Sequence, residues 1–389
     1  MYISAFLHRQ ELFEITVRWL SDALRPDDGL QITRILTYDS FVAWHTALDF
    51  VQSLNRRLGN PKALQRPLYR KRDLKDFITA ETPPASGRMA ELIASYRRMP
   101  EFFYVGSPMA GYLFHDREGR ALSVCRFKRV KRIAEKASRY AALFMYERVR
   151  RQSEAMMRDA GTPLSPEAPL TRDLLAAAER RIILHIRRQG LELPVGPMTI
   201  RDVVGAKIVD RGFGPGGLEA AIAAIPRTAV VDREDHRGDY NAVHYNVRLA
   251  VDPAPIVAAF EASPHRAVCR RRGLPADGST ADFEAFIDGG AGDLSLDLIL
   301  TTPDELIESE IGRSMHETRI FHQRQEGTVY GNIPVNIEYI IEYLLAVGLS
   351  PVVAVDEIPI KIWGRYLPDT LSYCIRNLYG IPEFSLLDA

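Results

Sequence analysis

The spacing of apolar residues changes along this chain, from a helical period before residue 190 to shorter, alternating segments after residue 200. Helical spacing covers 40–59, 132–152 and 171–190. The first of these segments starts at Ser40, a possible N-cap, and the last ends at Gly190, a residue typical of helix ends. The pattern therefore predicts a helical front part of the chain.

Short strands are predicted farther along. Residues 205–210, 242–251 and 294–302 are apolar or alternate apolar with polar positions, and 216–225 has the composition of a helix. A hairpin is also predicted around a turn at 117–119. Helices and strands alternate in this part, which indicates an α+β fold with a mixed β-sheet flanked by helices and a mainly helical N-terminal region.

Composition narrows the class of protein. The chain has 50 basic and 50 acidic residues, so its overall charge does not indicate a nucleic-acid or membrane partner, and any such partner would bind a local patch. The cysteines Cys125, Cys269 and Cys374 are far apart and odd in number, which fits neither a disulfide framework nor a zinc site. No apolar run approaches the ~20 residues of a membrane span. We expect a soluble, unprocessed protein of the cytoplasm, whose oligomeric state the sequence does not determine.

A basic run, RFKRVKRIAEK at 126–136, is the first stretch that suggests chemistry. It contains one acid, Glu135, and six basic residues: Arg126, Lys128, Arg129, Lys131, Arg132 and Lys136. Such a cluster is suited to binding phosphate groups. The alternative is a helix surface that faces solvent, because charge runs are common on surfaces.

Two acids stand at or in predicted strands. Asp202 precedes a strand that carries Lys207, and Asp297 is the one acid among the leucines of LSLDLILTT. Magnesium is held in proteins by one or two carboxylates together with phosphate oxygens, so these acids are candidate metal ligands. Alternatively, Asp202 stabilises a turn and Asp297 lies on a strand face exposed to water.

The strand at 242–251 and the residues before it display polar groups on one face. Side chains alternate between the two faces of a strand, so Tyr240, His244 and Arg248 are expected on the face opposite Val243 and Val247. The tyrosine ring is suited to stacking on a base, and the histidine and arginine are suited to phosphate or ribose. An ordinary exposed sheet face is the alternative, because tyrosine is common in strands.

The order of these elements over about 123–320 resembles the synthetase domain of the RelA/SpoT (p)ppGpp synthetase family. RDVVGAKIVD is similar to that family's Asp-x-x-Gly-x-Arg strand, with Asp202 as the metal ligand and Lys207 in place of the arginine. GDYNAVHY is similar to the Asn-Gly-Tyr-x-x-x-His motif, with Tyr240 and His244 at the family's spacing. SMHE at 314–317 is similar to the Met-His that ends the pattern.

The chain departs from the family at the glutamate strand. Asp297 takes the place of the glutamate in Glu-x-Gln-x-Arg-Thr, and neither the glutamine nor the arginine follows. A rival alignment uses Glu308 or Glu310, which lie in a segment with a helical pattern. The family's metal-dependent hydrolase activity is not expected, because the His115-Asp116 dipeptide falls in a predicted hairpin turn.

The resemblance, which leaves both ends of the chain unexplained, and the Pro-rich stretch at 81–87 together give an expected domain organisation. A helical N-terminal region would cover 1–85, ending near the Pro-rich stretch 81–87. A synthetase domain with a nucleotidyltransferase-like fold would cover 110–325, with insertions at 140–195 and 253–292. An α/β extension would cover 326–389.

The resemblance also implies a reaction, Mg²⁺-dependent transfer of pyrophosphate from ATP to the 3′-hydroxyl of a nucleotide acceptor (GDP, GTP or an adenine nucleotide) or of the 3′ end of a tRNA. Asp202 and Asp297 would bind Mg²⁺, and His244 would assist catalysis. The nucleotide-binding residues would be Arg126, Lys128, Lys131, Lys136, Lys207, Tyr240 and Arg248. Two alternatives stay open: a nucleotide sensor without turnover, and a module that binds nucleic acid through 126–139.

Overall fold

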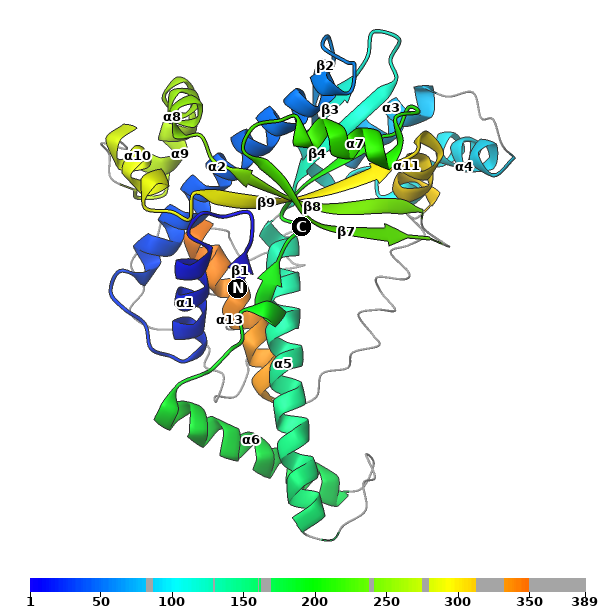
Figure 1. The fold of residues 1–389 in the computed structure, drawn as a ribbon. Helices are drawn as coiled ribbons and strands as arrows, with labels where there is room; N and C mark the ends of the chain where they lie inside the picture. The colour runs from blue at the N-terminus through cyan, green and yellow to red at the C-terminus, as the bar shows by residue number, and fades with distance from the viewer. Residues whose placement is uncertain are drawn as a thin grey trace, which may run out of the picture.

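A seven-stranded mixed sheet lies at the centre of the computed structural model (Figure 1). The structure describes residues 1–81, 87–128, 130–159, 161, 169–237, 241–274, 280–312 and 332–349. In spatial order the strands are β2 (Leu64–Arg70), β3 (Pro108–His115), β4 (Ala121–Phe127), β6 (Val204–Val209), β9 (Asp293–Thr301), β8 (Ala242–Ala250) and β7 (Thr228–His236). β6 and β9 run parallel, and the other neighbouring pairs are antiparallel. The α+β class with a mixed sheet is therefore confirmed.

Helices surround this sheet, and a two-stranded piece, β1 (Tyr2–Ile3) with β5 (Thr199–Ile200), lies beside it. The N-terminal helices are α1 (Arg9–Leu20) and α2 (Asp28–Arg57), and α13 (Asn332–Leu349) packs against α2 and α5. The other helices are α3 (Lys71–Glu81), α4 (Gly87–Arg98), η1 (Pro100–Phe103), α5 (Val130–Asp159), α6 (Pro169–Gln189), η2 (Gly196–Met198), α7 (Gly214–Ala223), α8 (Pro253–Ala262), α9 (His265–Arg271), α10 (Thr280–Asp288) and α11 (Pro303–Glu310). No helix in the ranges just given is long and apolar enough to cross a membrane.

The two faces of the sheet differ sharply. Tyr245, Leu298 and Ala206 are register partners on one face, and they are buried in the main apolar core together with residues of α2 and α5. The opposite face, which we call the polar face, is covered at one end by a second apolar cluster that joins Val124 and Val209 to α3, α4 and α11. Beyond that cluster the polar face carries charged side chains.

The structure corrects one predicted helix boundary. Ser40 does not start a helix but lies inside α2, which begins at Asp28. The apolar spacing continues upstream through Ile32 and Ile35, both fully buried, so the helix continues as well. The predicted hairpin at 117–119 is confirmed by β3 and β4.

Several sequence predictions fall partly outside the described residues. Residues 82–86 of the predicted linker belong to this group, and of the predicted extension 326–389 the structure describes only α13. β2, from the predicted N-terminal region, pairs with β3, from the predicted synthetase domain. Both segments therefore contribute strands to one sheet.

Candidate functional site

Three rows of register partners cross the centre of the polar face. In the middle row Asp297 on β9 lies between Gly205 on β6 and Asn246 on β8. The row toward α11 contains Lys207 and His244, and the row on the other side contains Arg248. The predicted alternation is thus confirmed: Asp297, His244 and Arg248 share a face. Side-chain direction alternates along each strand, so this follows directly from the register.

A cavity of about 330 Å³ opens over the middle row. Its floor includes Gly205, where an added Cβ would lie 3.2 Å from the main-chain oxygen of Asp297. The charged side chains that line this cavity are Lys71, Arg126, Lys128, Arg132, Asp202, Lys207 and Asp297. The basic run, the acid before β6 and the acid in β9 therefore meet in one place.

Asp202 is bound by two lysines of the basic run. The Lys128 ammonium donates to Oδ2, and the Lys136 ammonium donates to Oδ1 at 2.9 Å. Burial favours the neutral carboxyl, but the two ammonium groups outweigh burial and lower the pKa of Asp202 below its ordinary value. Asp202 is consequently an ionised carboxylate at neutral pH.

Asp297 lies in the same cavity without such partners. Within the described ranges its carboxylate makes no ion pair or hydrogen bond with another side chain. Burial and the negative charge of Asp202 raise the pKa of Asp297 to about 6, while Lys128 and Lys136 oppose that rise. Asp297 therefore lies near a second carboxylate and has no counterion of its own among the described residues.

The two acids are candidate ligands for a magnesium ion. A divalent cation between Asp202 and Asp297 would supply the missing positive charge beside Asp297. Among the described residues no group of three or more histidine, cysteine or acidic side chains could hold a metal. Two carboxylates are nevertheless the protein ligands that Mg²⁺ commonly uses, with water and phosphate oxygens completing its shell.

Glu310, from the rival alignment, also reaches the polar face. It ends α11, and its Oε1 accepts a hydrogen bond from Lys207 and forms an ion pair with Arg126, each at 2.7 Å. Burial opposes ionisation, yet these two cations lower the pKa of Glu310 far below its usual range. Arg126 and Lys207 thus already hold one anionic oxygen. Glu308, in contrast, pairs with Arg88.

His244 is half-buried on the row next to Asp297, and its ring lies 4.5 Å from that of His236. Burial lowers the pKa of His244, and the neighbouring His236 and Lys207 lower it further. The imidazole is therefore neutral at neutral pH, with one nitrogen able to donate and one able to accept.

Some predicted residues lie outside the described structure. They include Tyr240 and the SMHE segment at 314–317. Lys131 belongs to α5, but its side chain is not described. Conversely, sequence reasoning did not assign Lys71 or Glu310 to nucleotide binding, and it gave Arg132 no role beyond the basic run.

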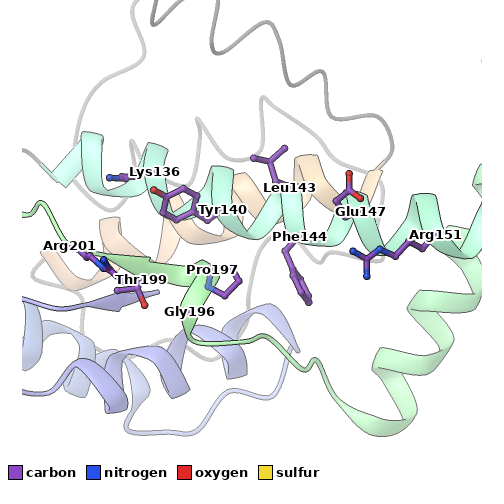
Figure 2. A pocket seen from close by; sticks show the side chains of 10 residues that line it. All are labelled: Lys136, Tyr140, Leu143, Phe144, Glu147, Arg151, Gly196, Pro197, Thr199 and Arg201. Carbon is purple, nitrogen blue, oxygen red and sulfur yellow. The ribbon is translucent and has the colours of Figure 1, made fainter. Parts of the chain in front are cut away.

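A larger hollow of about 650 Å³ runs along α5 (Figure 2). Tyr140 and Phe144 of α5 line it opposite Gly196 and Pro197. It adjoins the acid pair, because Lys136 lines it and also binds Asp202. Its one acidic lining residue is Glu147, so this hollow lacks the paired carboxylates of the smaller cavity.

Comparison of the chain with protein-family models, with curated proteins and with solved structures finds no match. Function is therefore inferred from the residues of the site.

Proposed function

We propose that this chain is a Mg²⁺-dependent pyrophosphokinase of the RelA/SpoT type, with a nucleotidyltransferase-like fold, that works in the cytoplasm. The observation that carries the proposal is the cavity in which Asp202 and Asp297 lie together with Arg126, Lys128 and Lys207. Paired carboxylates beside several cations are what transfer of a polyphosphate group requires.

The basic residues bind the donor. Arg126, Lys128, Lys131 and Lys136 neutralise the phosphates of ATP, and Lys207 assists from β6. The bond from Arg126 and Lys207 to a Glu310 oxygen supports this role, because a carboxylate oxygen and a phosphate oxygen present the same charged acceptor to a cation.

Asp202 and Asp297 hold Mg²⁺, and the ion supplies charge neutralisation on the transferred phosphates. The acceptor 3′-hydroxyl oxygen forms a bond to the β-phosphorus of ATP. The bond between that phosphorus and the oxygen bridging to the α-phosphorus breaks, and AMP leaves with the bridging oxygen. Asp297 accepts the hydroxyl proton, and neutral His244 donates a hydrogen bond to the sugar or phosphate. Tyr240 stacks on the acceptor base.

The test is a transfer assay with ATP labelled at the γ-phosphate, Mg²⁺ and separate acceptors: GDP, GTP, ADP and deacylated tRNA. We expect label in the 3′ position of one acceptor and an equal amount of AMP. Asp202→Asn serves as the inactive control. Release of ADP and inorganic phosphate, without AMP, would contradict pyrophosphate transfer.

A nucleotide sensor is the second candidate. The observation in its favour is that Asp202 and Glu310 already form ion pairs with four cations of the site: Lys128, Lys136, Arg126 and Lys207. A site closed by internal ion pairs suits reversible binding of a nucleotide. A sensor would bind nucleotide with an affinity that Mg²⁺ barely alters, whereas the pyrophosphokinase requires Mg²⁺.

The module that binds nucleic acid through the basic run has less support. Arg126, Lys128 and Lys136 each bind an acid inside the site, and Arg132 pairs with Glu135. The contacts of Arg126, Lys128 and Lys136 direct these three side chains into the site. A surface for nucleic acid needs cations that face solvent.

A further inference from the structure

A separate hollow of about 510 Å³ lies on the polar face on the side of Asp297 away from α11. Arg248 and Ser295, register partners of β8 and β9, form part of its floor. Arg201, the residue before Asp202, lines it as well. The hollow is therefore adjacent to the acid pair but is not part of the cavity that contains the basic run.

The charges in this hollow leave two guanidinium groups without a partner. Its lining contains three arginines and two acids, an excess of one positive charge. Arg9 is neutralised, because it donates to Asp293 at 2.6 Å. Neither Arg201 nor Arg248 forms an ion pair or side-chain hydrogen bond with the part of the chain that the structure describes. Guanidinium groups with this freedom are suited to bidentate binding of phosphate.

Asn246 provides an independent observation. It lines the same hollow and lies directly across from Asp297 in the strand register. Its side-chain oxygen is buried and accepts no hydrogen bond from any described residue. A buried acceptor without a donor costs free energy, and a ligand hydroxyl would satisfy it.

The order of these groups along β8 matches the order of groups in a nucleotide. Arg248 is two residues beyond Asn246, which is about 7 Å at the strand rise of ~3.3 Å per residue. A ribose beside Asn246 and Asp297 would place its 3′-hydroxyl at the acid pair. Its 5′-phosphates would then extend toward the two arginines.

We propose that this hollow binds the 5′-diphosphate or 5′-triphosphate of the acceptor nucleotide through Arg201 and Arg248, with Asn246 accepting a hydrogen bond from the ribose. The inference rests on the proposed function and names its acceptor class. A 5′-diphosphate or 5′-triphosphate carries enough negative charge to pair with both unpartnered guanidinium groups. A phosphodiester at the 3′ end of an RNA carries a single negative charge and could neutralise one of them.

The experiment is calorimetric titration of GDP, ADP, guanosine and adenosine into the parent protein and into Arg201→Ala/Arg248→Ala. Mg²⁺ and saturating α,β-methylene-ATP are present throughout, so that a donor site does not contribute. Arg270→Ala, which removes an exposed arginine of α9, is the charge-matched control. We expect the double variant to bind the preferred diphosphate at least ~10-fold more weakly, because charge-assisted bonds to the phosphates are lost. Its affinity for the nucleoside and its melting temperature should be unchanged.

Asn246→Ala separates the ribose contact from the phosphate contact. It should reduce the affinities for the nucleoside and for its diphosphate by the same factor, whereas the double arginine variant should reduce only the affinity for the diphosphate. Equal diphosphate affinity in parent and double variant overturns the inference, as does a parent protein that binds neither diphosphate. Diphosphate binding that depends on the two arginines, in a protein that transfers no pyrophosphate, would refute the proposed activity and leave this site in place.

Discussion

Lys136 and Asp202 are separated by 66 positions in the chain, yet the lysine ammonium lies 2.9 Å from the aspartate Oδ1. One residue comes from the basic run on α5 and the other from the segment before β6. Each had an ordinary alternative in the sequence, a solvent-facing helix for the run and a turn for the acid. Their contact makes both part of one electrostatic unit, which Lys128 completes from the end of β4.

The first prediction is that Asp202→Asn reduces pyrophosphate transfer by at least ~10²-fold, as expected for removal of a metal carboxylate. The variant should also melt at a lower temperature than the parent, because Lys128 and Lys136 lose the carboxylate that neutralises them. The transfer assay and a thermal melt check the two effects. Undiminished transfer would remove Asp202 from the metal site.

The second prediction is that Asp297→Asn is equally inactive but no less stable. Burial and the charge of Asp202 disfavour the ionised Asp297 in the folded protein, so a neutral amide of the same shape relieves a cost. We expect an equal or higher melting temperature at pH 7.5. Full activity of this variant would indicate that Glu308 or Glu310, and not Asp297, is the second metal ligand.

The third prediction concerns the donor. Arg126→Ala/Lys128→Ala should raise the apparent KM for ATP or abolish turnover, and should leave acceptor affinity unchanged, because both cations line the cavity of the acid pair. Arg150→Ala is the matched control, since Arg150 forms exposed pairs with Glu147 and Glu154 on α5. Unchanged kinetics in the double variant would indicate that the basic run does not bind ATP and is an ordinary charged surface.

The fourth prediction is a loss of stability in mild acid. Burial lowers the pKa values of His45, His244 and His265 in the folded protein. Because the unfolded chain binds these protons more readily, stability is complete above the ordinary histidine pKa of ~6.5 and falls as the pH drops through that value. Protonation of Asp297, whose pKa is raised to about 6, stabilises the parent over the same pH range, so melting temperatures are measured on Asp297→Asn between pH 5 and pH 8. Adding His265→Gln to that variant should flatten the dependence, and an Asp297→Asn protein whose stability rises toward pH 5 would contradict the prediction.

The central strands could be predicted from the sequence because each buries one face. Val243, Val247 and Leu298 carry that signal, and the same alternation places Asp297, His244 and Arg248 together. β2 and β7 were not predicted, and they are the two edge strands of the sheet. Most of their residues are exposed, and β2 includes Pro67, so neither shows an apolar alternation.

Other features depend on contacts between distant segments. The segment 253–292 is predicted to be an insertion, and it contributes to the main core: Phe260 and Phe283 stack at 4.0 Å, and both contact Tyr38 of α2. Lys71 and Glu310 reach the site because β2 pairs with β3 and because α11 packs against the polar face. No local pattern encodes such an approach.

The last prediction compares residues on the two faces of β8. Val247 is fully buried, so Val247→Ala should cost about 2 kcal/mol of stability and leave nucleotide affinity per folded molecule unchanged. His244→Ala should reduce turnover more than acceptor binding, since the imidazole lies one row from Asp297 on the polar face. Calorimetry, melting curves and the transfer assay distinguish these effects.

Tyr240, just before β8, completes the comparison. Tyr240→Phe should keep most of the acceptor affinity, because the ring makes the stacking contact and the hydroxyl does not. Tyr240→Ala should lose about 1 to 3 kcal/mol of acceptor binding, the range for one base on one aromatic side chain. If Tyr240→Ala binds the acceptor as tightly as the parent does, the tyrosine is ordinary surface and the resemblance to the synthetase family loses its most specific element.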